Sequence, residues 1–400
     1  MELKHRYNRR RRASLGILAL VLVVFFVGVF FGTNLRQIAH RLGINMVDSS
    51  FTKLEAIYEW VRQHHVDPNA LDPERAVEDA IRGMLPHVDG GYTRYESAEE
   101  AREFNQSTLE GKYSGVGIQS KPPVGGEMEV EIVFRGSPAE ASGVKVRDKI
   151  IAVDGQAIMG LTQMEINTRI RGEAGTDVTL TIVREGEPKP LNITIRRGVI
   201  TLPVVDYWVD GEVGVVAMNR FTETAPGQLK EAILQLKEKQ VRAILFDLRS
   251  NGGGLLYSAQ EIVDFFLAAD QVIVRQVDRY GNEQVLMTRE DTIWDGPLAV
   301  LLNGASASAS EVVAGALQDH GRAVLLGEVS FGKGTVQVPY PLTDGSRLWI
   351  TQYRYLTPNG RDIHEKGLTP DHAIEQPESA RVDEQLQQAI KYVKENMIRD

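Results

Sequence analysis

The chain has no cysteine, and this absence excludes a disulfide framework, a thiolate metal site and a thiol nucleophile. Histidine is also scarce, with 8 in 400 residues. The patterns H-E-x-x-H and C-x-x-C do not occur, and His320 and His364 are too far apart in the sequence to form one motif. We therefore expect no metal and no cofactor, and a catalytic nucleophile, if there is one, is not a thiol.

Outside the first residues, acidic side chains outnumber basic ones. The net charge is −9, which argues against nucleic acid as a partner. Residues 1–13 are the exception, since they hold six Lys or Arg and one Glu. The longest apolar run follows at Leu15–Gly32, and its 18 residues would extend about 27 Å as a helix, against about 30 Å for the hydrocarbon core of a bilayer.

These two features predict a basic cytoplasmic tail and an uncleaved transmembrane anchor over residues 1–33, with the rest of the chain on the outer side. The alternative is a cleaved signal peptide. The run ends in VFFGTNLRQIAH without a clear small-x-small cleavage site, so the anchor is favoured. The lack of cysteine is compatible with export.

The rest of the sequence changes character several times, which predicts a multidomain α/β protein. Residues 34–110 favour helices. Residues 111–198 consist of short β-type runs separated by turns that contain glycine, which is typical of a compact β-rich module. Residues 199–373 alternate strands with amphipathic helices, which predicts a sheet with helices packed on it. A helical tail, residues 374–400, ends the chain.

Three serines alternate in the segment NGASASASEVVAGALQDHG (303–321). Ser308 stands three residues before Glu311, which is the spacing of a capping box at the start of a helix. The same geometry also suits a nucleophile, because a serine between a buried strand and a helix projects its hydroxyl beside free N–H groups, beginning with that of Ala309. The spacing alone leaves both interpretations open. Asp319, three helical turns later, is interpreted as structural.

Lys333 lies between two glycines in GEVSFGKGTVQV (327–338), just before an apolar alternating strand. It could be an exposed turn lysine. A phosphate loop is disfavoured, because Gly334 stands where Ser or Thr is needed and a strand follows instead of a helix. A third interpretation is a lysine that has lost its water, so that its pKa falls and its amine accepts a proton from a serine.

Two glycine-rich turns complete the set of candidate sites. In FDLRSNGGGLL (246–256) a buried strand runs into glycines, which form either a plain tight turn or a place where the backbone approaches a ligand and aims an N–H at it. In YSGVGIQS (113–120) the turn is either an ordinary β-turn or a cradle for a carboxylate, beside a strand that accepts a peptide along its edge.

In this order and at these spacings, the segments resemble the C-terminal processing (tail-specific) serine peptidases, and the resemblance covers nearly everything after residue 50. YRYLTPNGRDIHEKGLTPD and GSPAEASGVKVRDKIIAVDG also carry it. It implies a PDZ domain at 111–198 and a crotonase-like (ClpP/crotonase superfold) β/α peptidase core at 199–373. The chain departs from the usual pattern of the family at Gly252, where Pro is usual, and at DGGY (89–92), which replaces DPHS.

The resemblance also implies roles for individual residues. Ser308 would be the nucleophile, Lys333 the general base and Gln337 the residue that orients the lysine amine. The backbone N–H groups of Ala309 and Gly253 would hold the oxyanion. The peptide-binding part of the PDZ domain would be Tyr113, Ser114, Gly115, Val116, Gly117 and Ile118.

The function expected from this resemblance is that of a serine endopeptidase that cuts proteins near their C-terminus after its PDZ domain captures a free apolar tail. Its expected location is the bacterial inner (cell) membrane, with a single span and an extracytoplasmic catalytic domain. The resemblance also allows a homo-oligomer or a regulatory partner. The alternatives are a catalytically inactive PDZ scaffold that binds C-terminal tails and, more distantly, a hydrolase of small esters or amides.

Overall fold

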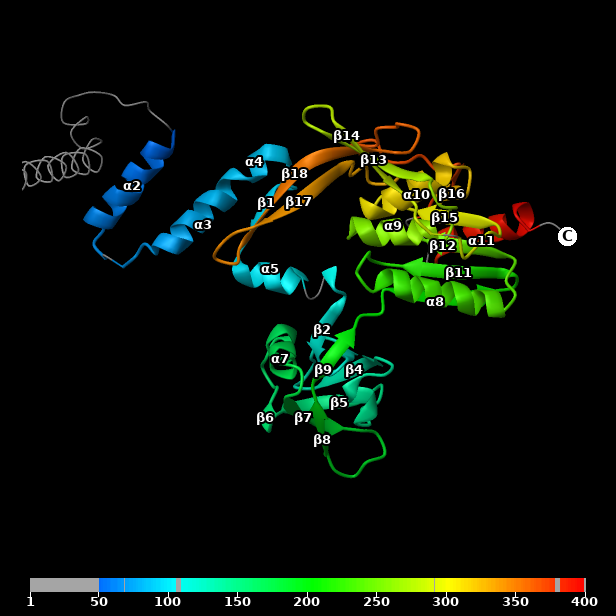
Figure 1. Cartoon of the computed structure of the whole chain (residues 1–400). Helices are drawn as coiled ribbons and strands as arrows, with labels where there is room; N and C mark the ends of the chain where they lie inside the picture. Colours follow the sequence, from blue (N-terminus) through cyan, green and yellow to red (C-terminus); the bar gives the residue numbers. More distant parts are fainter. Residues whose placement is uncertain (1–49, 68, 106–108, 291, 378–381, 399–400) are drawn as a thin grey trace, which may run out of the picture. The chain divides into compact units, whose positions relative to one another are not determined.

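The computed structural model describes residues 50–67, 69–105, 109–290, 292–377 and 382–398, which divide into two units between Gly83 and Met84 (Figure 1). The predicted membrane anchor at Leu15–Gly32 lies outside the described residues. In the part of the chain that is described, no helix has both the length and the apolar character needed to cross a bilayer.

From Ser50 onward, where the N-terminal unit is described, the chain forms helices α2 (Ser50–His64) and α3 (Pro73–Met84). Helix α3 begins with proline at its first position, where the missing N–H has no intrahelical acceptor to lose. The carboxylate of Asp72 caps this end, because it accepts the N–H of Glu74 at 2.9 Å and of Arg75 at 3.1 Å. The helices predicted from the sequence are therefore present here.

The second unit begins with a segment that the sequence analysis did not resolve. It contains helix α4 (Pro86–Asp89), strand β1 (Arg94–Glu96) and helix α5 (Ala98–Phe104). Strand β1 pairs antiparallel with the distant strand β18 (Arg347–Leu356), with Arg94 opposite Trp349. A strand of three residues has too few positions to show an alternating pattern, so its pairing could not be read from local sequence.

The β-rich module follows, and its strands alternate between buried and exposed side chains. Met128, Val130, Ile150, Leu180 and Ile182 are among the residues that fill its core. The first and last strands of the module pair with each other, which brings its two ends together. Its elements are β2 (Lys112–Gly115), β3 (Ile118–Ser120), β4 (Met128–Val133), α6 (Pro138–Ala141), β5 (Lys149–Val153), β6 (Gln156–Ala157), α7 (Gln163–Ile170), β7 (Asp177–Val183), β8 (Leu191–Arg196) and β9 (Gly198–Thr201).

The main sheet of the α/β part has the strand order β10-β11-β12-β15-β16-β19 and is parallel except at β10. Alternate side chains of its central strands pack on helices α8, α9 and α10 on one face and on helix α11 on the other. This arrangement is the layered sheet that the sequence predicted. The bounds are β10 (Val205–Asp210), β11 (Val213–Met218), β12 (Ala243–Asp247), β15 (Leu298–Leu302), β16 (Val324–Gly327), β19 (His372–Ala373), α8 (Ala225–Glu238), α9 (Leu256–Asp264), α10 (Ala309–Asp319) and α11 (Glu384–Asn396).

A second, antiparallel sheet joins β18 to β13 (Val272–Asp278), β14 (Glu283–Met287), β17 (Thr335–Pro341) and β1. Strands β17 and β18 form a long hairpin (Figure 1). Lys333 lies two residues before β17. The sheet thus fixes the chain on the C-terminal side of the lysine, while the main sheet fixes the chain on its N-terminal side.

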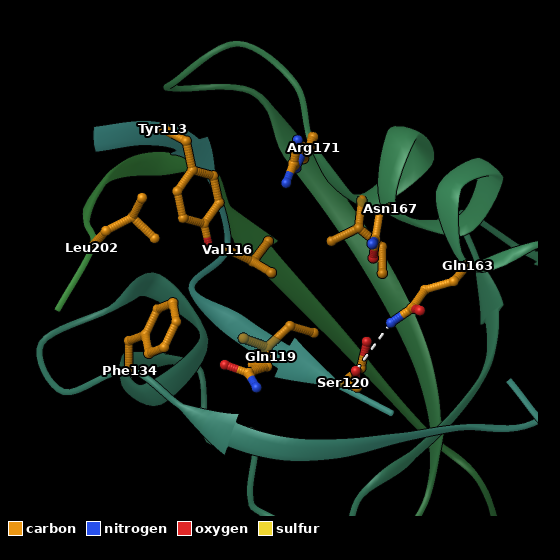
Figure 2. Close-up of a pocket in the computed structure, with 11 residues that line it drawn as sticks. Tyr113, Val116, Gln119, Ser120, Phe134, Gln163, Asn167, Arg171 and Leu202 are labelled. Atoms are coloured by element: carbon orange, nitrogen blue, oxygen red, sulfur yellow. Dashed lines mark hydrogen bonds between the residues drawn. The ribbon is translucent and has the colours of Figure 1, made fainter. Parts of the chain in front are cut away.

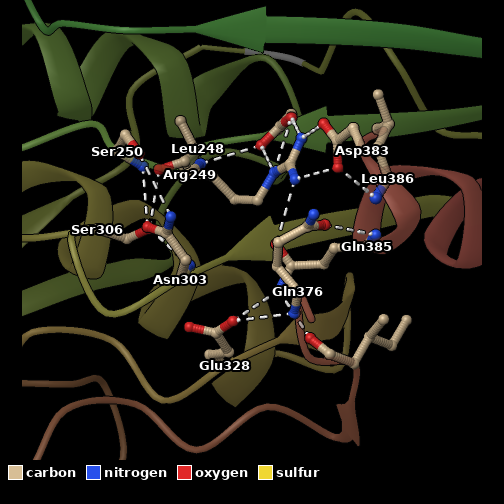
Figure 3. A network of polar contacts seen from close by, with 12 residues as sticks. Leu248, Arg249, Ser250, Asn303, Ser306, Glu328, Gln376, Asp383, Gln385 and Leu386 are labelled. Atoms are coloured by element: carbon tan, nitrogen blue, oxygen red, sulfur yellow. Dashed lines mark hydrogen bonds and ion pairs between the residues drawn. The ribbon is translucent and has the colours of Figure 1, made fainter. Parts of the chain in front are cut away.

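Arg249 ties the C-terminal helix to the end of strand β12 (Figure 3). Its guanidinium donates to Oδ2 of Asp247 at 2.7 Å, to both carboxylate oxygens of Asp383 at 2.7 Å, and to Oε1 of Gln385 at 3.1 Å. Burial disfavours the charged guanidinium, but the two carboxylates outweigh burial and raise the pKa of Arg249. Asp383 also caps α11 by accepting the N–H of Leu386 at 2.9 Å.

We expect Arg249→Ala to lower the free energy of unfolding by about 3 kcal/mol, because it leaves the carboxylate of Asp247 buried without its cation. Denaturant unfolding at pH 7, followed by circular dichroism, measures the change. Lys391→Ala is the control on the same helix: Lys391 and Glu395 are an exposed pair 3.9 Å apart, and its loss should cost less than about 0.5 kcal/mol. Equal effects of the two substitutions would contradict the role given to Arg249.

Candidate active site

Three neighbouring parallel strands end at the same edge of the main sheet and continue into the segments that the sequence analysis singled out. Strand β12 leads into the glycine-rich turn 248–254, β15 into the serine segment 303–308, and β16 into the lysine loop 328–334. Because the carboxyl ends of parallel strands meet at one edge, the fold gathers the three segments in one place.

The three alternating serines have different environments. Ser306 and Ser310 have no exposed surface. The hydroxyl of Ser306 donates to the carbonyl oxygen of Leu248, and that of Ser310 to the carbonyl oxygen of Asn251, each at 2.8 Å. Ser308 is partly exposed. The outer two hydroxyls thus fasten the segment to the glycine-rich turn, and the middle serine is the only one of the three with exposed surface.

The backbone of Ser308 is strained. Its φ is 58° and its ψ −115°, a combination that costs a residue with a side chain about 1–3 kcal/mol and that clusters at functional sites. The hydroxyl of Tyr355 holds the turn by donating to the carbonyl oxygen of Ser308 at 3.2 Å. Burial, followed by the nearby carboxylate of Glu311, raises the pKa of Tyr355 well above its usual value, so this donor keeps its proton.

Gly253 packs directly against the serine turn. It has a φ of +95°, and a Cβ on it would lie 2.8 Å from the nitrogen of Ala309 and 2.8 Å from Cβ of Ser308, so a side chain would not fit. The N–H of Ala309 is the first of helix α10 and has no intrahelical acceptor. The N–H of Gly253, however, donates to Oδ1 of Asn251 at 2.9 Å. Of the two expected oxyanion donors, Gly253 is therefore engaged elsewhere in this conformation.

Glu311 joins the serine turn to the lysine loop. Its carboxylate is fully buried and accepts the N–H of Ser308 at 2.8 Å and the N–H of Lys333 at 2.9 Å. It also accepts the N–H of Gly332 and the hydroxyl of Ser330, both at 2.6 Å. The sequence analysis gave Glu311 only a capping role. Its bonds to the lysine loop depend on a contact between distant segments, and no local signal could have revealed them.

The side chain of Lys333 is partly buried. Burial lowers the pKa of Lys333, and Arg94 lowers it further, against the opposite influence of Glu311 and Asp89. Its Nζ lies 5.0 Å from the centroid of the Tyr92 ring. Among the described residues, the structure gives no hydrogen bond between Nζ of Lys333 and the hydroxyl of Ser308. The two backbones are brought together, but the amine points at the ring of Tyr92.

Gln337 lies on β17, four residues after Lys333. Its Nε2 donates to the hydroxyl oxygens of Thr335 at 3.0 Å and of Thr351 at 3.1 Å. Within the described part of the chain, no hydrogen bond joins Gln337 to Lys333. The expected orienting contact is thus not made in this conformation, and Gln337 instead fastens β17 to β18.

The acidic residues near the site have structural partners. Asp319 forms an ion pair with Arg361 and accepts the N–H of Asn359 at 2.8 Å, in agreement with the structural interpretation given to it. Where the chain is described, no group of three or more His, Cys, Asp or Glu side chains is arranged to hold a metal ion.

The β-rich module has a pocket of about 280 Å³ beside the predicted peptide-binding loop (Figure 2). Tyr113, Val116 and Ile118 line it, whereas Ser114 and Gly115 belong to the pairing of β2 with β9, and Gly117 is not among its lining residues. On the opposite wall lie residues of helix α7 and Arg171, the charged member of the described lining. The guanidinium of Arg171 lies 5.5 Å from the centroid of the Tyr113 ring. Burial raises the pKa of Tyr113, and Arg171 acts in the opposite direction.

Comparison with known proteins assigns both parts of the chain. The model of peptidase family S41 matches residues 212–374, and a PDZ-domain model matches residues 108–195. A carboxy-terminal-processing protease of Bartonella bacilliformis is 38% identical over 365 residues, which cover 89% of this chain and 83% of that protein. The carboxy-terminal processing protease CtpB of Bacillus subtilis is 35% identical over 338 residues, 83% of this chain and 69% of the relative.

A solved structure, that of the photosystem II D1 C-terminal processing protease, is 28% identical and covers 80% of this chain and 86% of that one, with a TM-score of 0.47. The family assignment rests on the sequence relatives. On their identity and coverage, the chain belongs to peptidase family S41 and is a serine peptidase of the carboxy-terminal processing type.

Proposed function

We propose that this protein cleaves polypeptides near their C-terminus with Ser308 as nucleophile and Lys333 as general base. The observation that carries the proposal is the buried carboxylate of Glu311, which accepts the backbone N–H of both residues. It links the two backbones through one side chain, and we propose that the lysine amine turns from Tyr92 toward the serine hydroxyl when substrate binds.

The proposed reaction has two stages. The hydroxyl oxygen of Ser308 attacks the scissile carbonyl carbon while its proton passes to Nζ of Lys333, and the lysine then gives this proton to the departing amine as the C–N bond breaks. Water next attacks the acyl carbon and passes a proton to Lys333, which returns it to the oxygen of Ser308 as the acyl C–O bond breaks and the carboxylic acid leaves. A base must be neutral to act, so the lowered pKa of Lys333 favours it, and the rate should rise with pH as the amine loses its proton.

The negative charge that develops on the carbonyl oxygen needs donors beside Ser308. The N–H of Ala309 stands at the positive end of helix α10, and within the described ranges no hydrogen bond from it is found. Gly253 is close enough to supply the second N–H, since a Cβ on it would lie only 2.8 Å from the nitrogen of Ala309. We propose that Gly253 exchanges Asn251 for the oxyanion when substrate binds.

The PDZ pocket is proposed to hold the C-terminal tail of the substrate. Val116, Ile118 and Phe134 give it an apolar lining, which suits an apolar terminal side chain. Arg171 supplies the positive charge that a free carboxylate requires. Extended tails would add along the neighbouring strand β3, which is the end strand of its sheet.

We also propose that the apolar run Leu15–Gly32 anchors the protein in the bacterial inner membrane, with both domains on the extracytoplasmic side. The support is the sequence pattern alone: an apolar run of 18 residues after a strongly basic tail. Such an anchor would hold the peptidase near exported or membrane-attached substrates.

We expect Ser308→Ala to abolish cleavage, with a loss of at least about a thousandfold in kcat, while leaving tail binding unchanged. The assay uses pairs of unfolded proteins that differ only in a free or amidated C-terminus, with the cuts mapped by mass spectrometry and binding measured by fluorescence anisotropy. The free-tailed member should be cut and bound preferentially. A wild-type protein that binds tails but cuts neither member would instead identify a scaffold.

We expect Glu311→Gln to lower kcat by about a hundredfold and to destabilise the protein by about 1–3 kcal/mol, because an amide cannot accept from all four donors and leaves buried N–H groups unpaired. Steady-state kinetics and thermal unfolding measure the two effects. Glu231→Gln, on the exposed face of helix α8, is the control and should change neither. A fully active Glu311→Gln protein would remove the role of this carboxylate in aligning the site.

A further inference from the structure

The loop with the sequence DGGY (89–92) lies beside Lys333, although the two are far apart in the sequence. It leaves helix α4 through Gly90 and Gly91, whose φ angles of 70° and 100° require a residue without a side chain. It then enters strand β1 at Arg94. Between these two points the Tyr92 ring faces Lys333, with its centroid 5.0 Å from Nζ.

The loop is held on β18 by a partly buried set of hydrogen bonds. The carboxylate of Asp89 accepts the N–H and the hydroxyl of Thr93, both at 2.7 Å, and the hydroxyl of Thr351 at 2.6 Å. Although burial acts to raise it, these bonds lower the pKa of Asp89, so the carboxylate stays charged and accepting. Thr351 is also the residue to which Gln337 donates. The loop and the strand after the lysine therefore share one anchor.

The other end of the loop is held by stacking. The guanidinium of Arg94 lies 4.8 Å from the ring centroid of Trp349 and 5.4 Å from that of Phe104. It donates to Oε1 of Glu96 at 3.0 Å, and Glu96 also pairs with the buried Arg347. With both ends fixed, the Tyr92 side chain between them has a defined position.

We propose that Tyr92 is a positioning residue of the peptidase, whose ring keeps water away from the amine of Lys333 and so maintains the lysine as a base. The inference rests on the proposed function, because it concerns the lysine assigned as base there. Tyr92 touches neither the nucleophile nor the reacting carbonyl in this account. It acts through the lysine alone.

The charged groups around the amine of Lys333 act on its pKa in opposite directions. Arg94, on the loop side, disfavours the ammonium form, whereas Glu311 of helix α10 and Asp89 favour it. His364 packs against Gly334, the residue after Lys333: a Cβ on Gly334 would lie 2.8 Å from the backbone nitrogen of His364. The charged groups thus act in both directions, and burial is the largest influence on the pKa of Lys333. The Tyr92 ring is part of what buries the amine.

The ring itself acts in two ways that can be separated. By excluding water it favours the neutral amine, whereas its π face attracts the ammonium form. Tyr92→Phe keeps both effects, Tyr92→Leu keeps an apolar cover without a π face, and Tyr92→Ala removes both. If dehydration is the contribution that counts, Phe and Leu should behave like the wild type and Ala should not.

The test measures kcat/KM against pH on a free-tailed substrate with the full chain. In Tyr92→Ala the midpoint of the rise should move up by about one pH unit, so that kcat/KM falls about tenfold at neutral pH and recovers at alkaline pH. Tyr92→Phe and Tyr92→Leu should keep the wild-type midpoint. Tyr280→Ala removes an exposed tyrosine from the turn between β13 and β14 of the same sheet and is the control.

A second measurement does not depend on cleavage. Competitive acetylation of Lys333, quantified by mass spectrometry over a range of pH, titrates the amine directly, so a shift in Tyr92→Ala is visible even if the wild type cuts no substrate. An unchanged midpoint in Tyr92→Ala, or a loss of rate that is uniform with pH, would overturn the proposal. A lower midpoint in Tyr92→Ala, with higher activity at neutral pH, would also overturn the proposal. In that case the main effect of the Tyr92 ring would be to stabilise the ammonium form of Lys333.

Discussion

The site depends on one buried carboxylate. Glu311 accepts four hydrogen bonds and shares them between the serine turn and the lysine loop. The lysine loop has glycine on both sides of Lys333 and little intrinsic rigidity. Without an acceptor common to both segments, the lysine would have no fixed position relative to the serine. Three of the four donors are backbone N–H groups and the fourth is the hydroxyl of Ser330, so none of them comes from the hydroxyl of Ser308 or the amine of Lys333.

The rest of the fold supplies the three segments that this carboxylate holds together. The three segments follow the parallel strands β12, β15 and β16, whose carboxyl ends lie at the same edge of the main sheet. Gly253 lets the backbones of the turn and the serine segment approach without a side chain between them. Ser306 and Ser310 fasten the same two segments by hydrogen bonds. The second sheet adds the loop with Tyr92, which covers the amine.

Sequence reasoning predicted the β-rich module, the layered sheet and the three segments, because each has a local signal such as periodicity, a glycine-rich turn or a cap. The spacing to Glu311 singled out Ser308 among the three serines but left open whether it caps a helix or acts as a nucleophile. The resemblance proposed Ser308 as nucleophile, and this stays a prediction; the structure shows only that Ser306 and Ser310 are fully buried. The contacts of Glu311, the pairing of β1 and the position of Tyr92 all join distant segments, so no local pattern could reveal them.

Two expected contacts are absent from this conformation of the described residues: Gln337 bonds to threonines, and the N–H of Gly253 bonds to Asn251. Together with the position of the lysine amine, they fit the proposal that the backbones of the site are aligned before its side chains engage a substrate. Binding of a substrate would then need to change only a few side-chain and backbone contacts, at low cost in conformational free energy.

The central claim is that the amine of Lys333 activates the hydroxyl of Ser308. The most direct measurement is the rate at which a fluorophosphonate modifies Ser308, followed by mass spectrometry across a range of pH in the wild type and in Lys333→Met. The account predicts a wild-type rate that rises with pH as the lysine loses its proton, and a rate at least about a hundredfold lower, without that rise, in Lys333→Met. Equal rates in the two proteins, or modification at Ser306 or Ser310 instead, would contradict it.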